Sequence, residues 1–256
     1  MEGLFDLSRG LIVVGLTMLL VLLRLDAERF GTAEYFETAR DGEPPRNRRR
    51  LAWYGLGIAL VGAIFAIHPN PEADLFLGTG DRLGAVFGGL IFAGIGVAQA
   101  IAFATVRYQR IRFPETSSYP GALLNSTATA FIDEATFRGA IFGTLLTLGF
   151  DPNLANVIQA LIYALTTRLG APGRDRYLLV LTLAVGIIGG WLTAVTGGIA
   201  AAFLGHAATR FAVFLCTGHT GQTLPKGREV EEIDRRRRPP EGWHVIGSRE
   251  SSQRDR

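Results

Sequence analysis

The chain has 256 residues, a formal net charge of +3 and a single cysteine, Cys216. One cysteine excludes an internal disulfide and a metal site built from cysteines. Hydrophobic residues make up 48% of the chain and gather in long runs, while the charge lies mainly in the loops and tail, which excludes an ordinary soluble domain. No glycine-rich phosphate loop and no nucleic-acid module is visible, so we expect no nucleic-acid partner. Lysine occurs once, at Lys226, and this favours a GC-rich bacterial source.

Seven apolar runs predict an all-α fold, a polytopic membrane helical bundle. A helix rises about 1.5 Å per residue, so roughly 20 residues cross the bilayer core. The first run has no small-residue cleavage site, and we interpret it as a membrane anchor. The fourth run is too long to stand upright, so we expect a tilt or bend. The predicted spans, within a bundle over 1–218, are about 10–25, 51–68, 83–106, 120–149, 153–168, 176–196 and 198–216.

The arginines predict how the chain crosses the membrane. The loops after the first, third and fifth spans and the tail hold nearly all of the basic residues, whereas the opposite side has only Arg9 and Arg82. By the positive-inside rule the N-terminus is external, the C-terminus is cytoplasmic, and the protein lies in the cell membrane. Residues 219–256 form a polar basic cytoplasmic tail, which we expect to be disordered. Its arginine run either contacts anionic lipid or only fixes the topology.

Charged residues interrupt the fourth and the last span. Asp133, Glu134 and Arg138 lie in the fourth, where Glu134 and Arg138 are four residues apart and share a helix face. His206 and Arg210 have the same spacing in the last span. Ionisable groups at this depth normally face a bundle interior or a hydrated cavity. The pattern therefore predicts one polar cavity between these two spans, extended along the fourth span by Asn125, Ser126 and Thr129.

Such a cavity is suited to acid–base chemistry. A carboxylate beside water can take a proton and pass it on, and an imidazole can orient the same water or polarise a carbonyl. A zinc site needs three good protein ligands. Asp133, Glu134 and His206 can be assembled into such a set, but nothing in their spacing demands it. We therefore predict no cofactor and no metal, with Glu134 and His206 as the ligands if a metal is bound.

The same residues permit two other interpretations. Asp133, Glu134, Arg138 and Arg210 sum to zero charge with a neutral His206, so they can form a closed ion-pair network that fixes helix register. A transporter with a carboxylate proton relay is a further alternative. The absence of visible inverted halves counts against the transporter.

A motif of two acids, three further residues, an arginine and a glycine stands at Asp133-Glu134-Ala-Thr-Phe-Arg138-Gly139. It resembles the first motif of the CPBP intramembrane proteases, the family of CAAX-processing and bacteriocin-processing (Abi) proteins. Tyr163 and Thr167 lie at the positions of the second motif, an aromatic residue followed by a histidine four residues later. A threonine–glycine turn before His206 is similar to the approach to the last motif. The resemblance covers about 120–212.

The resemblance implies a catalytic set of Asp133, Glu134, Arg138 and His206. The sequence departs from the family's pattern at three positions. The first acid, which the family uses to activate water, is usually glutamate and here is the shorter Asp133. The second-motif histidine is replaced by Thr167, and the asparagine four residues after the last histidine is replaced by Arg210. We expect Arg210, as a permanent cation, to form a salt bridge with Asp133.

The sequence thus predicts a CPBP-like intramembrane endopeptidase that hydrolyses a membrane-associated peptide or protein, with altered or lost activity. The alternative is a non-catalytic pseudoprotease that serves as a membrane scaffold or binding subunit. A pocket that reaches Asp133, with Arg210 turned away, favours the enzyme. Contact between Asp133 and Arg210 in a closed site favours the scaffold.

Overall fold

A computed structural model describes residues 2–32, 47–108, 111, 113–114, 116, 119–170 and 178–217, and all the regular structure within these ranges is helical. The predicted tail, 219–256, lies outside the described residues. The all-α fold class predicted from the sequence is confirmed. The elements are α1 (Glu2–Leu25), α2 (Asn47–Ile67), α3 (Pro71–Asp74), α4 (Arg82–Tyr108), α5 (Tyr119–Glu134), η2 (Ala135–Ile141), α6 (Phe142–Thr147), α7 (Pro152–Leu169), α8 (Leu178–Thr196) and α9 (Ala200–Thr217).

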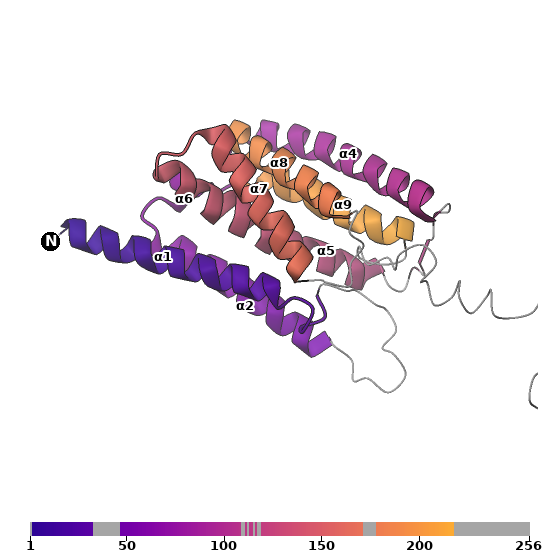
Figure 1. The fold of residues 1–256 in the computed structure, drawn as a ribbon, viewed down its shortest axis with the longest axis horizontal. Helices are drawn as coiled ribbons and strands as arrows, with labels where there is room; N and C mark the ends of the chain where they lie inside the picture. Colours follow the sequence, from indigo (N-terminus) through magenta and orange to yellow (C-terminus); the bar gives the residue numbers. More distant parts are fainter. Residues whose placement is uncertain are drawn as a thin grey trace, which may run out of the picture. The chain divides into compact units, whose positions relative to one another are not determined.

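Each predicted span corresponds to a helical segment, and the fourth corresponds to three consecutive elements. α5, η2 and α6 follow one another without a break from Tyr119 to Thr147. α1 lies beside α2, and α4 lies beside α9 (Figure 1). Among the described helices, four are long and apolar enough to cross a membrane, with the windows Ser8–Leu25, Arg48–Ile67, Arg82–Val106 and Leu179–Thr196. These four agree with a multi-pass membrane bundle, while the seven crossings and the orientation of the termini stay predictions.

Local signals end α6 and start α7. Gly149 adopts φ +85°, a left-handed conformation that glycine accepts without strain and that ends helices. Asp151 then caps α7, because its Oδ1 accepts hydrogen bonds from the backbone N–H groups of Asn153, at 2.9 Å, and Leu154, at 3.1 Å. Pro152 occupies the first turn, where a missing N–H costs nothing. Local residues therefore determine the break between these two helices.

The connector between α3 and α4 holds the turn between α8 and α9. The backbone N–H of Asp81 donates to the carbonyl of Thr196 at 2.7 Å. The N–H of Ile199 donates to the carbonyls of Phe76 and Gly78, both at 3.1 Å. Gly80 and Gly198 allow the two segments to touch, because a Cβ on either one would overlap the backbone of the other. This clip fixes the start of α9, the helix that carries His206.

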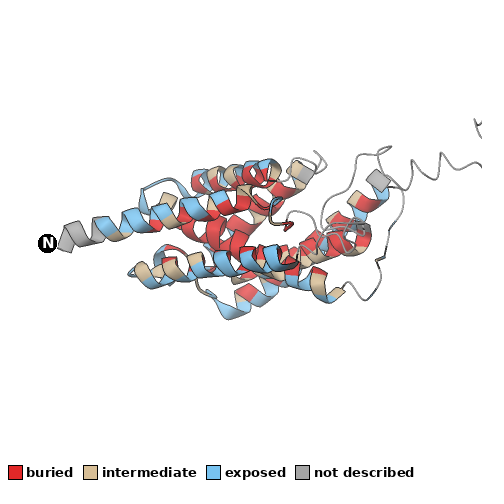
Figure 2. Ribbon diagram, turned by 90° about the horizontal axis from the view of Figure 1, so that it is seen from below, coloured by how far each residue is buried: buried red, intermediate tan, exposed pale blue. Residues whose placement is uncertain are grey.

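The apolar residues divide into an inner set and an outward-facing set. Buried residues gather between the helices, and exposed residues lie on the outward faces (Figure 2). On α4, large side chains such as Leu83, Phe87 and Leu90 are more than 60% exposed. A face of this kind is expected where helices meet lipid instead of water. The opposite face of α4 packs against α9, where Gly89 and Gly96 leave room for the side chains of Leu204 and Thr209.

We expect Gly205→Ala to destabilise the packing of α4 against α9. A Cβ at Gly205 would overlap the ring of Phe92, which is 1% exposed and has no space to retreat. Overpacking of this kind costs about 1–3 kcal/mol. Thermal unfolding of the detergent-solubilised protein measures the loss. Gly94→Ala on α4, where a Cβ meets nothing within 4 Å, is the matched control and should not lower stability.

Candidate functional site

The two acids of the first motif stand where the helix changes its hydrogen-bonding pattern. Asp133 and Glu134 are the last residues of α5, and seven residues of π-helix follow as η2. The backbone N–H of Phe142 donates to the carbonyl of Phe137, five residues back, as a π-helical turn requires. Such turns are rare and occur frequently at functional sites. The site therefore lies on a local distortion of the helix, with both carboxylates at most 1% exposed.

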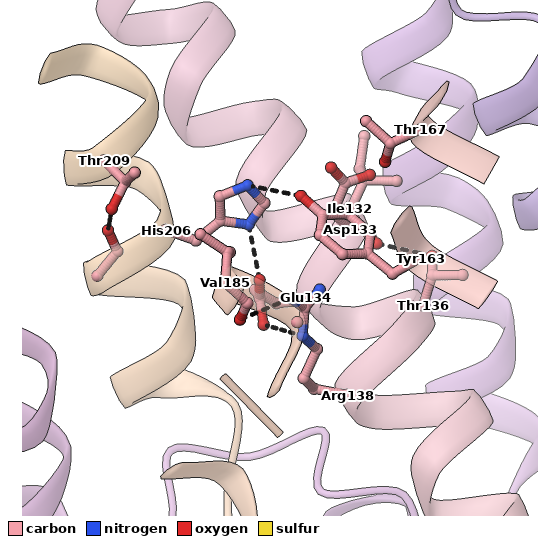
Figure 3. A network of polar contacts seen from close by, with 12 residues as sticks. Ile132, Asp133, Glu134, Thr136, Arg138, Tyr163, Thr167, Val185, His206 and Thr209 are labelled. Carbon is pink, nitrogen blue, oxygen red and sulfur yellow. Dashed lines mark hydrogen bonds and ion pairs between the residues drawn. The ribbon is translucent and has the colours of Figure 1, made fainter. Parts of the chain in front are cut away.

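Glu134 forms the centre of a chain of polar contacts (Figure 3). Its Oε1 lies 2.6 Å from Nδ1 of His206, and Nε2 of the same imidazole lies 3.0 Å from the hydroxyl of Tyr163. With the proton on Nδ1, the imidazole donates to the carboxylate and accepts from the tyrosine. The chain thus joins α5, α9 and α7, and it uses both ring nitrogens of His206.

Arg138 closes the chain from the other side. Its Nε lies 3.2 Å from Oε2 of Glu134, an ion pair without hydrogen-bond alignment, and its Nη2 donates to the carbonyl of Val185 at 3.1 Å. The guanidinium also lies over the ring of Tyr163, 4.2 Å from its centroid. Gly189 of α8 permits this approach, because its Cβ position is only 3.1 Å from Nε of Arg138.

Asp133 is paired with Arg24, so the predicted salt bridge to Arg210 is wrong. Nε of Arg24 lies 2.9 Å from Oδ1 of Asp133. Nη2 of Arg24 donates to Oγ1 of Thr167 at 3.5 Å. Arg24 is 2% exposed, so it belongs to the interior of the bundle and not to the loop after the first span. The guanidinium therefore bridges two of the positions at which the sequence departs from the family pattern.

A periodic signal for Arg24 is present in the sequence. Val13, Thr17 and Leu20 are buried at helical spacing on α1, and Arg24 continues the same stripe four residues later. The end of this helix is held by Trp53, whose Nε1 donates to the carbonyl of Leu23 at 2.8 Å. An arginine at the end of a membrane span is ordinarily attributed to the loop, which hides this role.

Arg210 lies beside the cluster without a carboxylate partner. It is 8% exposed, its Nε is buried without a hydrogen-bond partner, and no ion pair joins it to a described residue. The sequence-predicted residues Asp133, Glu134, Arg138 and His206 therefore come together, with Thr167 next to them through Arg24. Arg210 instead faces a cavity.

The cavity has a volume of about 50 Å³ and reaches His206 but neither carboxylate. The residues that line it are Gln99, Ala100, Tyr163, Leu181, Thr182, Val185, His206, Thr209, Arg210 and Val213. From the sequence, one structural condition favours an enzyme and one favours a scaffold, and the structure meets each of them only in part. Arg210 forms no ion pair with Asp133, yet the cavity does not reach Asp133.

Glu134 and His206 are the potential metal ligands that lie together. Within the described ranges, no group of three or more His, Cys, Asp or Glu side chains is placed to hold a metal ion. The other carboxylate, Asp133, is occupied by Arg24 at 2.9 Å. Because a structural or catalytic zinc needs at least three protein ligands, this donor set does not fit one.

The fold and the site together define a polytopic helical membrane protein with a buried cluster of acids, arginines and a histidine. Residues 115–212 match the family described as Type II CAAX prenyl endopeptidase Rce1-like. This match confirms the resemblance to the CPBP intramembrane proteases predicted from the motifs. It spans α5 to most of α9 and includes every member of the cluster except Arg24. Comparison with the curated proteins and with the solved structures gives no match.

Proposed function

We propose that this protein is a membrane-embedded binding protein built on a CAAX-protease-like domain, in which ordinary peptide hydrolysis has been lost. The observation that carries the proposal is the position of Arg24, between Asp133 and Thr167. Its ligand belongs to the class of membrane-associated peptides, proteins or lipids. The lipid bilayer surrounds the protein whichever of these ligands it binds.

Water activation is the first function that this arrangement opposes. A carboxylate acts as a general base only within hydrogen-bond reach of the water or hydroxyl that loses its proton. Asp133 is 1% exposed, paired with a guanidinium and absent from the cavity wall. The guanidinium of Arg24, at 2.9 Å, also occupies the Oδ1 atom of Asp133 that a water would otherwise approach. Asp133 is thus better suited to hold α1 against α5 than to activate water.

The second-motif position supports the same conclusion. Thr167 has a hydroxyl where the family has an imidazole, and a hydroxyl is not a base at neutral pH. In this protein it accepts a hydrogen bond from Arg24. Threonine is smaller than histidine, so the exchange leaves room for a guanidinium beside position 167. We therefore interpret the exchange of histidine for threonine and the inward position of Arg24 as linked changes.

An endopeptidase with altered chemistry is the second candidate, and one observation favours it. His206 lines the cavity and is bonded to Glu134 at 2.6 Å, so a water in the cavity has an imidazole beside it that a carboxylate orients. In that case Tyr163 releases Nε2 of His206, which becomes the base, while Glu134 orients the imidazole and Arg210 holds the developing oxyanion. Of the two carboxylates in the family pattern, only Glu134 then takes part in the chemistry.

A peptidase measurement in reconstituted vesicles distinguishes the two candidates. We expect the full-length protein to release no more product than protein-free vesicles, with prenylated CAAX-ended peptides and other membrane-associated peptides followed by mass spectrometry. Asp133→Ala and Glu134→Gln are measured beside it. Cleavage that Asp133→Ala abolishes contradicts the proposal. Cleavage that survives Asp133→Ala but is lost in Glu134→Gln assigns the altered chemistry.

A further inference from the structure

The buried charges of the site do not balance. Three guanidinium groups, of Arg24, Arg138 and Arg210, lie among two carboxylates, Asp133 and Glu134, and all five side chains are at least nine-tenths buried. Each carboxylate has its own arginine, at 2.9 Å and 3.2 Å. With a neutral His206, Arg210 is the cation that no carboxylate compensates among the described residues. An unpaired charge inside a membrane protein is costly, and such charges generally have a functional reason.

The cavity gives Arg210 access to a ligand. Arg210 forms one wall, and its Nε is completely buried without a hydrogen-bond partner. Gln99 of α4 forms another wall, and its amide oxygen is also buried without a partner. The amide group can present its NH₂ to the same space when it is turned about its last bond. With the amide turned, a donor from α4 and a donor from α9 converge on one small volume.

The shape and chemistry of the cavity select the type of anion. A guanidinium presents a planar fork that matches a carboxylate with two parallel hydrogen bonds. One water needs roughly 10–15 Å³ of such volume, so a cavity of about 50 Å³ has room for a few atoms, which suits a carboxylate better than a phosphodiester headgroup. Ala100, Leu181, Val185 and Val213 supply apolar walls for the first carbons of the chain that follows.

We propose that this cavity is a carboxylate-binding site in which Arg210 is the principal ligand-binding residue, and that it takes an amphiphilic monocarboxylate. The carboxylate belongs either to a free fatty acid or to the C-terminus of a peptide, two sources with the same chemistry. This inference names the ligand of the proposed binding protein and rests on that function. Arg210 stands where the family resemblance places an asparagine, so the site is a property of this chain's own residue.

Ligand titration of the purified full-length protein in neutral detergent tests the site. Decanoate should raise the melting temperature in a saturable way, whereas decanol, which has the same chain without the charge, should not. Arg210→Gln should weaken decanoate binding on the order of 10- to 100-fold, since a hydrogen-bonded charge contributes about 1.5–3 kcal/mol. Arg210→Lys keeps the charge without the fork and should lie between the two. Arg82→Gln, at an exposed arginine, is the control and should bind as the unchanged protein does.

A second arm identifies the source of the carboxylate. A hydrophobic peptide with a free C-terminus is compared with the same peptide amidated at its end. Binding of the free peptide alone assigns a chain terminus, binding of decanoate alone assigns a fatty acid, and either result supports the site when Arg210→Gln removes it. Decanoate binding that is unchanged in Arg210→Gln, or no binding in either arm, overturns the inference. Peptide cleavage during these titrations contradicts the proposed loss of hydrolysis but leaves the site intact.

The stability of the ligand-free variant gives an independent reading. Because no described carboxylate pairs with the buried Arg210, Arg210→Gln should raise the melting temperature in the absence of carboxylates. A decrease shows that Arg210 has a structural partner, and that outcome also overturns the inference. In Arg210→Gln we therefore expect a higher melting temperature without ligand together with a lower affinity for decanoate. A variant that merely folds badly cannot produce this combination.

Discussion

Replacing Arg24 by methionine should destabilise the protein by about 3–5 kcal/mol, one of the largest effects that we expect. The substitution keeps most of the apolar length of the side chain but removes the partner of Asp133, which is 1% exposed and 2.9 Å from the guanidinium. A buried carboxylate without its cation retains the full cost of leaving water. Chemical or thermal unfolding in detergent measures the change in the free energy of unfolding.

A double-mutant cycle isolates the pair from the size of the side chains. Arg24→Met combined with Asp133→Leu replaces both charges by apolar groups and should recover most of the lost stability, because such replacements are often neutral. The surface pair of Arg29 and Asp26 is the matched control, with side chains 82% and 48% exposed. Arg29→Met should change stability by less than about 1 kcal/mol. A loss in Arg24→Met no larger than in this control contradicts the assigned ion pair.

The Arg24–Asp133 pair also shows why the site cannot be understood from the family-like segment alone. The family match covers 115–212, whereas Arg24 belongs to α1, far outside it. The threonine at 167 looks like a simple loss when only the matched segment is considered. With α1 in place, it is the acceptor of a hydrogen bond from the arginine that holds the first acid. We interpret the change at 167 and the arginine at 24 as a single exchange of a catalytic contact for a structural one.

The sequence predicted the parts of the site that a local pattern or the surrounding lipid constrains. Glu134 and Arg138 are four residues apart, and their side chains form the ion pair that this spacing favours. The apolar runs predicted the helices, because length and composition decide what can cross a bilayer. The approach of Glu134 to His206 followed from polar residues on two spans that both had to avoid lipid. In each case a local pattern or the solvent supplied the constraint.

Contacts between helices that depend on rotation and depth were not predictable in the same way. The alternative of a neutral four-residue network did not include Arg24, because long basic side chains near span ends normally reach the interface. The assumed pair of Asp133 and Arg210 failed because Arg24 is nearer to Asp133, and spacing along α9 says nothing about distance across the bundle. The π-helical turn at 135–141 has no signature in periodicity, yet it contains Arg138 and Gly139, the rest of the motif.

Arg138 is the second position at which we expect a large effect, because it is fully buried and its one guanidinium makes three contacts. It pairs with Glu134 at 3.2 Å, donates to the carbonyl of Val185 at 3.1 Å, and lies over the ring of Tyr163 at 4.2 Å. Arg138→Leu removes all three and leaves Glu134 with His206 alone. We expect a loss of about 3–5 kcal/mol, measured as for Arg24.

Arg138→Lys separates the charge of this side chain from its shape. An ammonium can still neutralise Glu134, but it has no planar fork to serve a carboxylate, a carbonyl and a ring together. We therefore expect lysine to recover only part of the loss and to remain about 1.5–3 kcal/mol less stable than arginine. Arg82→Lys, at an exposed position, controls for the exchange itself and should be neutral.

Full recovery of stability by lysine contradicts the proposal that all three contacts matter, and it leaves charge as the only role of Arg138. Partial recovery shows that the arginine of the first motif holds α7, α8 and the acid-bearing helix together by its shape. That role is needed whether or not the site hydrolyses a peptide, so the motif can persist in a protein that only binds its ligand.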